Sequence, residues 1–228
     1  MMTAFAVIAT AGFLIGGIPF GYLAGWVSLR EDIRQHGSGN IGATNVWRVL
    51  GARWGVVVLL LDALKGMGPT LLARWWFQSA DLVSWNQTAM VTGGIAAVMG
   101  HMYPVYLRLR GGKGVATGLG VVAVVGPLPT LAALLIFLLL ATTTRIIALA
   151  SMGAAVTYGV AQLVQLGGEA MEPHQIALTA FAISVPLLII WKHRSNISRI
   201  LSGTESRFSF RRRRTLAEQP VSADKNAI

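Results

Sequence analysis

Long runs of apolar residues alternate with short polar segments along this chain. A helix needs about 20 mainly apolar residues to cross the hydrocarbon core of a bilayer. Runs of about this length occupy residues 3–29, 54–77, 88–107, 146–166 and 175–191. A further run, 114–141, is interrupted by Gly126-Pro127-Leu128-Pro129, which predicts two short helices. The pattern therefore predicts an all-α, polytopic membrane protein.

The placement of basic residues decides between six spans, with 114–141 as one kinked helix, and seven. With seven spans and the N-terminus outside, one face receives almost every loop Arg and Lys, together with the basic tail from Lys192. The opposite face receives Arg74 with Asp81, Glu169 and Glu172, whereas six spans would place the basic tail outside. Cytoplasmic loops are enriched in Lys and Arg. We therefore predict seven transmembrane helices, two of them short, with a cytoplasmic C-terminus.

Composition supports the bilayer and removes several kinds of chemistry. Hydrophobic residues make up 54% of the 228 and charged residues 12%, against about a quarter charged in globular domains. The absence of cysteine excludes disulfides and a thiolate nucleophile. The net charge of +10 comes mainly from the loops of one face, so no nucleic acid partner is expected. No metal and no cofactor are expected either. Residues 1–207 are expected to form one domain, and 208–228 a disordered basic cytoplasmic tail against anionic lipid headgroups.

Three polar segments at the predicted cytoplasmic face differ from the rest of the chain. They are Gly37-Ser38-Gly39-Asn40-Ile41-Gly42-Ala43-Thr44-Asn45 followed by Arg48, then Gly111-Gly112-Lys113-Gly114-Val115-Ala116-Thr117, and last Lys192-His193-Arg194-Ser195-Asn196-Ile197-Ser198-Arg199 with Gly203-Thr204-Glu205. Glycine lets backbone N–H groups converge on an anion, and Lys or Arg pairs with phosphate. Glycine and small polar residues also serve in helix packing, but packing does not explain this mixture in three loops on one face. The combination favours an anionic-ligand site.

Other classes of protein fit these segments less well. The second segment is not a nucleotide-binding P-loop, because Leu107 replaces the required glycine and Gly114 follows the lysine. A transporter for an anionic solute would also use broken helices and a basic site. It needs access from both faces, whereas the polar residues here gather at one. That asymmetry favours an enzyme at the boundary between membrane and cytoplasm.

In this order, the three segments resemble the signature motifs of the bacterial acyl-phosphate:glycerol-3-phosphate acyltransferase family (PlsY). The resemblance implies a multi-pass enzyme of the bacterial inner membrane with its site at the cytoplasmic face. Such an enzyme moves a fatty acyl group from acyl phosphate to the 1-hydroxyl of sn-glycerol 3-phosphate, and the products are lysophosphatidic acid and phosphate for phospholipid synthesis. Its expected partners are these substrates, membrane lipids and, by functional coupling, a soluble acyl-phosphate-forming enzyme. Two departures are Ile41, often proline in relatives, and Ala148 before Ser151, where the family usually has serine at both positions.

The residues of the motifs receive roles from the resemblance and from the chemistry. Acyl phosphate carries a good leaving group, so the protein has to position two phosphates and a hydroxyl, without a covalent nucleophile. The expected catalytic residues are Ser38, His193 and Asn196. The expected substrate-binding residues are Asn45, Arg48, Gly111, Gly112, Lys113, Gly114, Thr117 and Arg145. Glu205 is expected to hold the third loop through an Arg or a backbone N–H.

Three further points stay open at this stage. The proton of the attacking hydroxyl can go to His193 or to the phosphate of glycerol 3-phosphate itself, whose second pKa lies near 6. Asp62 and Lys65 share one helical face inside the second span, either as a neutralising pair or as functional groups. His101 is either an interhelical hydrogen-bonding residue or part of the site.

Overall fold

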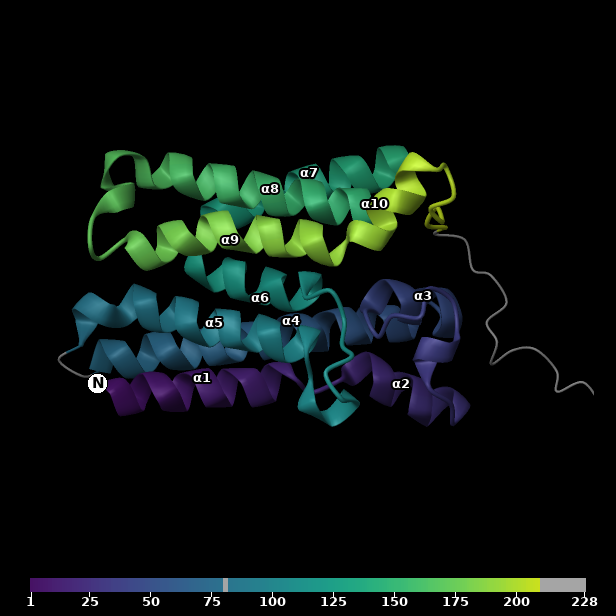
Figure 1. The fold of residues 1–228 in the computed structure, drawn as a ribbon, viewed down its shortest axis with the longest axis horizontal. Coiled ribbons are helices and arrows are strands. Elements are labelled where there is room, and N and C mark those ends of the chain that lie inside the picture. Colours follow the sequence, from purple (N-terminus) through teal and green to yellow (C-terminus); the bar gives the residue numbers. More distant parts are fainter. Residues whose placement is uncertain (80–81, 210–228) are drawn as a thin grey trace, which may run out of the picture.

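The computed structural model describes residues 1–79 and 82–209, and within them the chain is helical with no strand (Figure 1). The α-helices are α1 (Met2–Gly16), α2 (Phe20–Leu29), α3 (Ala43–Leu50), α4 (Ala52–Ser79), α5 (Asn86–Met102), α6 (Val115–Val125), α7 (Pro127–Thr144), α8 (Ile147–Leu166), α9 (Ile176–Lys192) and α10 (Arg194–Leu201). Short 3-10 turns lie at η1 (Ile33–Gln35), η2 (Val83–Trp85), η3 (Val105–Leu107) and η4 (Gly167–Met171). Of the predicted tail, residues 210–228 lie outside the described residues.

Several helices are long and apolar enough to cross a membrane. Within the described residues, four segments meet that test: Met2–Leu29, Ala52–Gln78, Pro127–Thr144 and Ile147–Met171. A fifth is obtained if α9 and α10, bent by 59° at their junction, count as one span. Many leucines and valines on the outer faces of these helices are exposed, as a lipid-facing surface requires. The protein is therefore an all-α, multi-pass integral membrane protein.

Proline explains where the helix boundaries differ from those predicted by the apolar runs. The predicted break after Gly126 is confirmed, with Pro127 in the first turn of α7, where its missing N–H costs nothing. Of the two helices predicted to be short, α6 is short, with 11 residues. The prediction is wrong for α7, which has 18 residues. The first apolar run was expected as one helix and is divided into α1 and α2 around Pro19. The third apolar run leaves the helix after Met102, since Pro104 disfavours helical backbone before it.

Glycine brings the helices around the site into close contact. A Cβ on Gly120 of α6 would lie 1.8 Å from the Ala63 carbonyl oxygen of α4, and one on Gly66 of α4 would lie 2.1 Å from the carbonyl oxygen of Thr117. Neither position accepts a side chain without a shift of backbone. This close packing fixes the N-terminal end of α6, where Lys113 lies, against α4.

Figure 1 shows how the fold gathers the three polar segments. Helices α7, α8 and α9 lie on one side, α1, α4 and α5 on the other, and α6 lies between them. The segment between α2 and α3, the segment before α6, and the junction of α9 with α10 all lie at the same end of the helices. Phe208, predicted to belong to the disordered tail, instead packs on Trp47 of α3 with 5.2 Å between ring centroids.

Candidate active site

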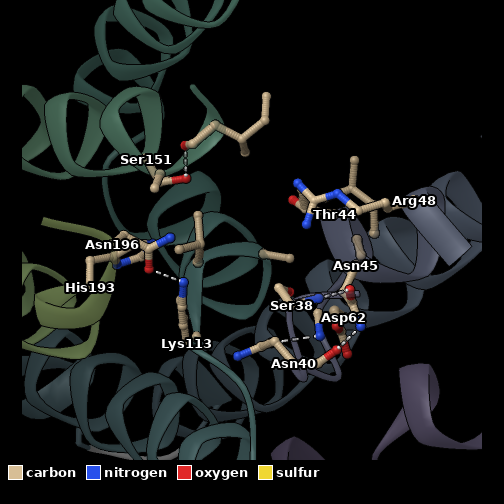
Figure 2. A pocket seen from close by; sticks show the side chains of 18 of the residues that line it. Ser38, Asn40, Thr44, Asn45, Arg48, Asp62, Lys113, Ser151, His193 and Asn196 are labelled. Carbon is tan, nitrogen blue, oxygen red and sulfur yellow. Dashed lines mark hydrogen bonds between the residues drawn. The ribbon is translucent and has the colours of Figure 1, made fainter. Parts of the chain in front are cut away.

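A cavity of about 160 Å³ lies at this end, and all three polar segments contribute to it (Figure 2). Its lining includes eight of the residues predicted for the site: Ser38, Asn45, Arg48, Lys113, Gly114, His193, Asn196 and Glu205. Polar residues without an assigned role also line it, among them Asn40, Thr44 and Ser151, and so do Asp62 and His101, whose roles the sequence left open. Asn40 and Thr44 are part of the first motif, so the motif itself was the available signal for them.

Asn45 holds the first segment in shape. Its side-chain oxygen accepts the N–H of Ser38 at 2.7 Å, and its amide nitrogen donates to the carbonyls of Asn40 at 2.8 Å and His36 at 3.1 Å. The side chain is buried, and a Cβ on Gly37, where φ is +60°, would lie 2.3 Å from its oxygen. Asn45 was expected to bind substrate. Its hydrogen bonds fasten the loop, because buried backbone groups require partners, and its place in the lining keeps substrate binding as a prediction.

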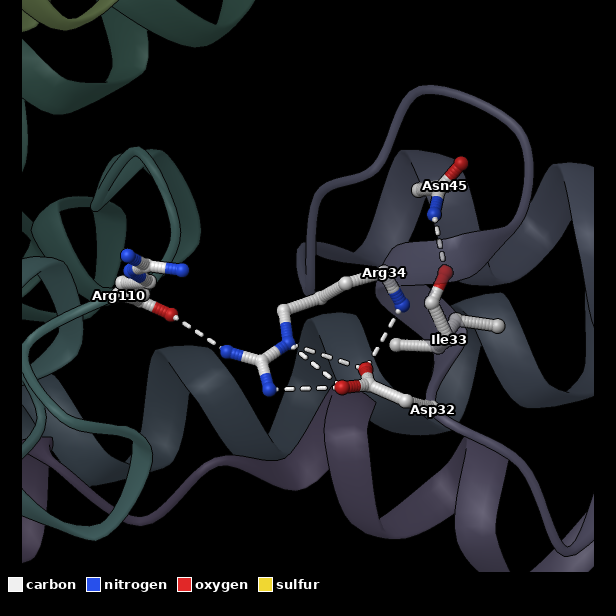
Figure 3. A network of polar contacts seen from close by, with 5 residues as sticks. All are labelled: Asp32, Ile33, Arg34, Asn45 and Arg110. Carbon is white, nitrogen blue, oxygen red and sulfur yellow. Dashed lines mark hydrogen bonds and ion pairs between the residues drawn. The ribbon is translucent and has the colours of Figure 1, made fainter.

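An ion pair on the outer side of this loop connects it to the second segment (Figure 3). Arg34 donates to both carboxylate oxygens of Asp32, at 3.0 Å from Nε and 2.7 Å from Nη2, and to the carbonyl of Arg110 at 3.5 Å. The guanidinium lowers the pKa of Asp32 below its usual value. The two loops therefore approach the cavity as neighbours.

Helix N-termini face the cavity, an arrangement that favours anions. Within the described residues, the first turns of α3, α6 and α8 reach the lining through Ala43, Val115 and Ala148. The N–H groups of a first turn have no acceptor within their own helix, and the helix dipole places partial positive charge there. Gly114 adopts φ +79° at the start of α6, a conformation that favours glycine. With the Arg48 and Lys113 side chains in the same lining, the site is built for phosphate.

Gly111 and Gly112, predicted to bind substrate, lie just before the residues that line the cavity. Their N–H groups donate to the carbonyls of Met102 at 3.3 Å and His101 at 3.1 Å, so the pair closes the end of α5. Two other predicted binding residues are also absent from the lining. Thr117 is fully buried against α4, and Arg145 is exposed in the left-handed turn between α7 and α8. Both positions follow from helix packing, which motif membership does not reveal.

A chain of hydrogen bonds connects the second and third segments. Lys113 Nζ donates to the side-chain oxygen of Asn196, whose amide nitrogen donates to Glu205 Oε1 at 2.7 Å. Glu205 Oε2 accepts from Arg199 Nε at 2.6 Å, which is the contact with an arginine that was expected for it. Burial, opposed by the charge of Glu205 and supported by the nearby Arg199 and Arg48, lowers the pKa of Lys113 to about 8. Lys113 is thus a cation that substrate phosphate would stabilise.

The pKa of Lys113 predicts a loss of acceptor binding at alkaline pH. Because the folded pKa lies near 8, the ammonium is charged below that pH and becomes neutral above it. For glycerol 3-phosphate, the acceptor that the resemblance implies, we expect kcat/KM to fall as pH rises through about 8, since kcat/KM reports groups of the free enzyme. Initial rates corrected for spontaneous acyl phosphate hydrolysis measure this. Lys113→Arg should move the fall to higher pH, and a decline shared unchanged by this variant would contradict the assignment.

His193 lies at the junction of α9 and α10 with one ring nitrogen committed. Nδ1 donates to the Ile189 carbonyl at 2.8 Å, which leaves Nε2 as the acceptor of the neutral ring. Burial, together with the positive charge of Lys113, lowers the pKa of His193 to about 4. The ring is therefore neutral at physiological pH and is a weak proton acceptor before substrate binds.

The second departure from the family pattern also lies in the cavity. Ala148 and Ser151 both contribute to the lining from the first turns of α8. Ser151 Oγ donates to the Ile147 carbonyl at 2.8 Å, an intrahelical bond that leaves its lone pairs free. Because Ala148 has no hydroxyl, the only donors that this turn of α8 could offer to an anion are its backbone N–H groups.

Fold and cavity together define an integral membrane protein with a polar cavity at one end of its helices, lined by Lys113, Arg48 and, among the described residues, three helix N-termini. Residues 6–203 match the family model described as glycerol-3-phosphate acyltransferase. The chain is 41% identical over 203 residues to the glycerol-3-phosphate acyltransferase of Myxococcus xanthus, covering 89% of this chain and 99% of that one. It is 42% identical over 207 residues to that of Syntrophotalea carbinolica, covering 91% and 99%.

Two crystal structures show the same fold. Both are of PlsY, an integral membrane glycerol 3-phosphate acyltransferase, at 38% identity to this chain. The glycerol 3-phosphate form has a TM-score of 0.79 and covers 90% of this chain and 96% of its own. The lysophosphatidic acid form has a TM-score of 0.76 and covers 90% and 95%. The chain belongs to the glycerol-3-phosphate acyltransferase family.

Proposed function

We propose that this protein transfers a fatty acyl group from acyl phosphate to the 1-hydroxyl of sn-glycerol 3-phosphate. The observation that carries the proposal is the convergence of three helix N-termini, among the described residues, with Lys113 and Arg48 in one cavity. Such a cavity can hold the phosphates of both substrates. The relatives and both solved structures bear the name of an acyltransferase that uses this acceptor.

The reaction needs positioning more than covalent catalysis. The 1-hydroxyl oxygen attacks the acyl carbonyl carbon and forms the ester, while the bond from that carbon to the phosphate oxygen breaks and phosphate leaves. Lys113 and the first turn of α6 would hold the acceptor phosphate, and Arg48 with the first turn of α3 would hold the leaving phosphate. Ser38 and Asn196 would donate to the developing oxyanion and orient the hydroxyl.

The proton of the hydroxyl would pass to a phosphate oxygen. His193 would only orient the substrate, through a hydrogen bond accepted by Nε2. A phosphate monoester with a pKa near 6 accepts a proton more readily than an imidazole at about 4. His193→Gln places a carbonyl oxygen near the position of Nε2, so we expect turnover within about tenfold of wild type, whereas loss of a general base costs about 10²–10⁴-fold. His193→Asn, which keeps the donor toward Ile189, is the companion variant. A loss of about a thousandfold or more in both would make His193 the base.

The topology proposed with this function has seven crossings, an outside N-terminus and a cytoplasmic site in the bacterial inner membrane. Its support is the back-and-forth path of the helices in Figure 1 and the basic residues near the site end. Residues 1–207 would form the single catalytic domain, and 208–228 a cytoplasmic tail at anionic lipids. Functional coupling to a soluble enzyme that forms acyl phosphate would follow from a donor that hydrolyses readily in water.

One assay tests the proposed reaction. Purified protein in detergent should convert acyl phosphate and glycerol 3-phosphate to lysophosphatidic acid and phosphate in equal amounts. Activity with acyl-CoA or an acylated carrier protein, and none with acyl phosphate, would show that the acyl donor is a thioester and that the proposed donor is wrong. No product from any of these donors would overturn the enzymatic assignment.

A further inference from the structure

A buried group of ionisable side chains lies at the cavity and has no part in the mechanism above. It consists of Asp62 and Lys65 on α4 and His101 on α5, with exposed fractions of 1%, 4% and 3%. Asp62 and His101 contribute to the lining of the cavity. A buried ion pair is weak support for stability, since apolar residues of similar volume serve as well or better. Charges inside a membrane protein therefore call for a functional explanation.

The contacts of the group extend in two directions from the Asp62 carboxylate. Lys65 Nζ lies 2.8 Å from Asp62 Oδ1 and donates to the Ile18 carbonyl at 2.7 Å, in the break between α1 and α2. His101 Nδ1 lies 3.7 Å from the same carboxylate oxygen and has no hydrogen-bond partner among the described residues. A carboxylate on that side favours the tautomer with the proton on Nδ1.

His101 in turn packs directly on the segment that carries Lys113. Its carbonyl accepts the Gly112 N–H at 3.1 Å, and a Cβ on Gly112 would lie only 2.1 Å from its Nε2. The imidazole thus occupies the space where any side chain at position 112 would project. The orientation of this ring decides where the backbone passes just before Lys113 enters the cavity.

We infer that Asp62 and His101 are positioning residues for Lys113: the carboxylate fixes the imidazole, and the imidazole fixes the Gly112–Lys113 backbone at the phosphate site. The inference rests on the proposed function, in which Lys113 holds the acceptor phosphate. Lys65 neutralises the carboxylate and ties it to the break before α2, the helix that leads to the first motif. One buried group therefore sets the spacing of two phosphate-binding loops. A site of this kind must be held to within about half an ångström.

The alternative is that Asp62 only neutralises Lys65. The paired variant Asp62→Leu/Lys65→Met separates the two explanations, because it removes both charges together and leaves no buried charge unpaired. If Asp62 is a positioning residue, this variant should lose roughly 100-fold in kcat/KM for glycerol 3-phosphate. The loss should appear as a higher KM for the acceptor, and KM for acyl phosphate should change much less. Wild-type kinetics in this variant would overturn the inference.

Variants of His101 test the second step without touching the ion pair. His101→Asn keeps an N–H donor near the position of Nδ1 and should retain activity within about tenfold, whereas His101→Leu should match the double variant. Gln162→Leu is the matched control, since Gln162 is buried on α8, accepts the Tyr158 hydroxyl at 3.3 Å and is absent from the cavity lining. Equal losses in Asn and Leu variants, or an equal loss in the control, would overturn the positioning role.

A readout independent of catalysis is the titration of Lys113. Competitive labelling with acetic anhydride at several pH values, followed by mass spectrometry, gives the pKa of this amine in the folded protein. It should lie near 8 in wild type and rise toward about 10.4, the solvated value, in His101→Leu, because a loosened loop lets water reach the ammonium. An unchanged titration in that variant overturns the inference. An inactive wild-type protein with the expected titration would instead count against the proposed reaction alone.

Discussion

Replacing Lys113 by methionine is expected to lower kcat/KM for glycerol 3-phosphate about a thousandfold. Removing one partner of a buried, hydrogen-bonded charge pair costs about 2–5 kcal/mol, and each 1.4 kcal/mol is a factor of ten. Methionine keeps the length and the apolar stem while removing the ammonium that faces the cavity. The side-chain oxygen of Asn196 also loses its donor, so the hydrogen bonds from Lys113 through Asn196 to Glu205 and Arg199 lose their first member. Steady-state kinetics with both substrates varied measure the effect.

Two lysine variants serve as controls for this result. Lys113→Arg keeps the charge and should recover part of the activity, although a planar guanidinium does not replace a compact ammonium in every geometry. Lys192→Met removes a neighbouring cation whose Nζ lies 4.4 Å from the centroid of the Tyr103 ring, outside the cavity lining. It should cost about fivefold at most. Equal losses in the methionine variants would mean that general positive charge, and not Lys113 itself, holds the phosphate.

Asp62→Asn alone is expected to destabilise the protein by about 3–5 kcal/mol, the cost of leaving a buried charge uncompensated. In this variant the Lys65 ammonium would still contact the Ile18 carbonyl and the face of the Phe20 ring, but neither carries a full negative charge. Unfolding in detergent, followed by circular dichroism against SDS concentration or temperature, measures the loss. The addition of Lys65→Met should recover most of it, because no unpaired charge then remains.

A more exposed ion pair provides the comparison for this stability effect. Asp32 and Arg34 have side-chain exposures of 23% and 29%, and Asp32→Asn should cost about 1 kcal/mol or less. If Asp62→Asn costs no more than this, Lys65 has lost its proton or gained water in the membrane-embedded region. The paired variant would then bring no recovery, contrary to the expectation.

The sequence predicted the site better than it predicted the hydrogen bonds within it. Residues of all three motifs line the cavity, because motif residues with a shared chemical purpose must meet in the fold. Asn45, Gly111 and Gly112 belong to the same motifs, yet their polar groups bond to backbone. Motif membership does not distinguish a residue that binds a ligand from one that shapes the loop, since both are equally intolerant of substitution.

The sequence also left Asp62 and His101 undecided, since they lie in different apolar runs and nothing in the sequence shows that they meet. Their proximity to each other and to Gly112 depends on how α4 and α5 pack at the end nearest the site. Helix packing of this kind is set by many small contacts, among them Gly66 and Gly120 against neighbouring backbone. A single chain read residue by residue does not show which helix faces meet.

The sequence by itself indicated that the protein lies in a membrane and is helical, and it predicted an anion site in three polar segments. These conclusions need only the length of apolar runs, the placement of charge and the types of residue in each loop. The tertiary structure decided the break at Pro19, the convergence of helix N-termini on one cavity, and the neighbours of Lys113. Such features depend on distances between residues far apart in the chain, which packing alone sets.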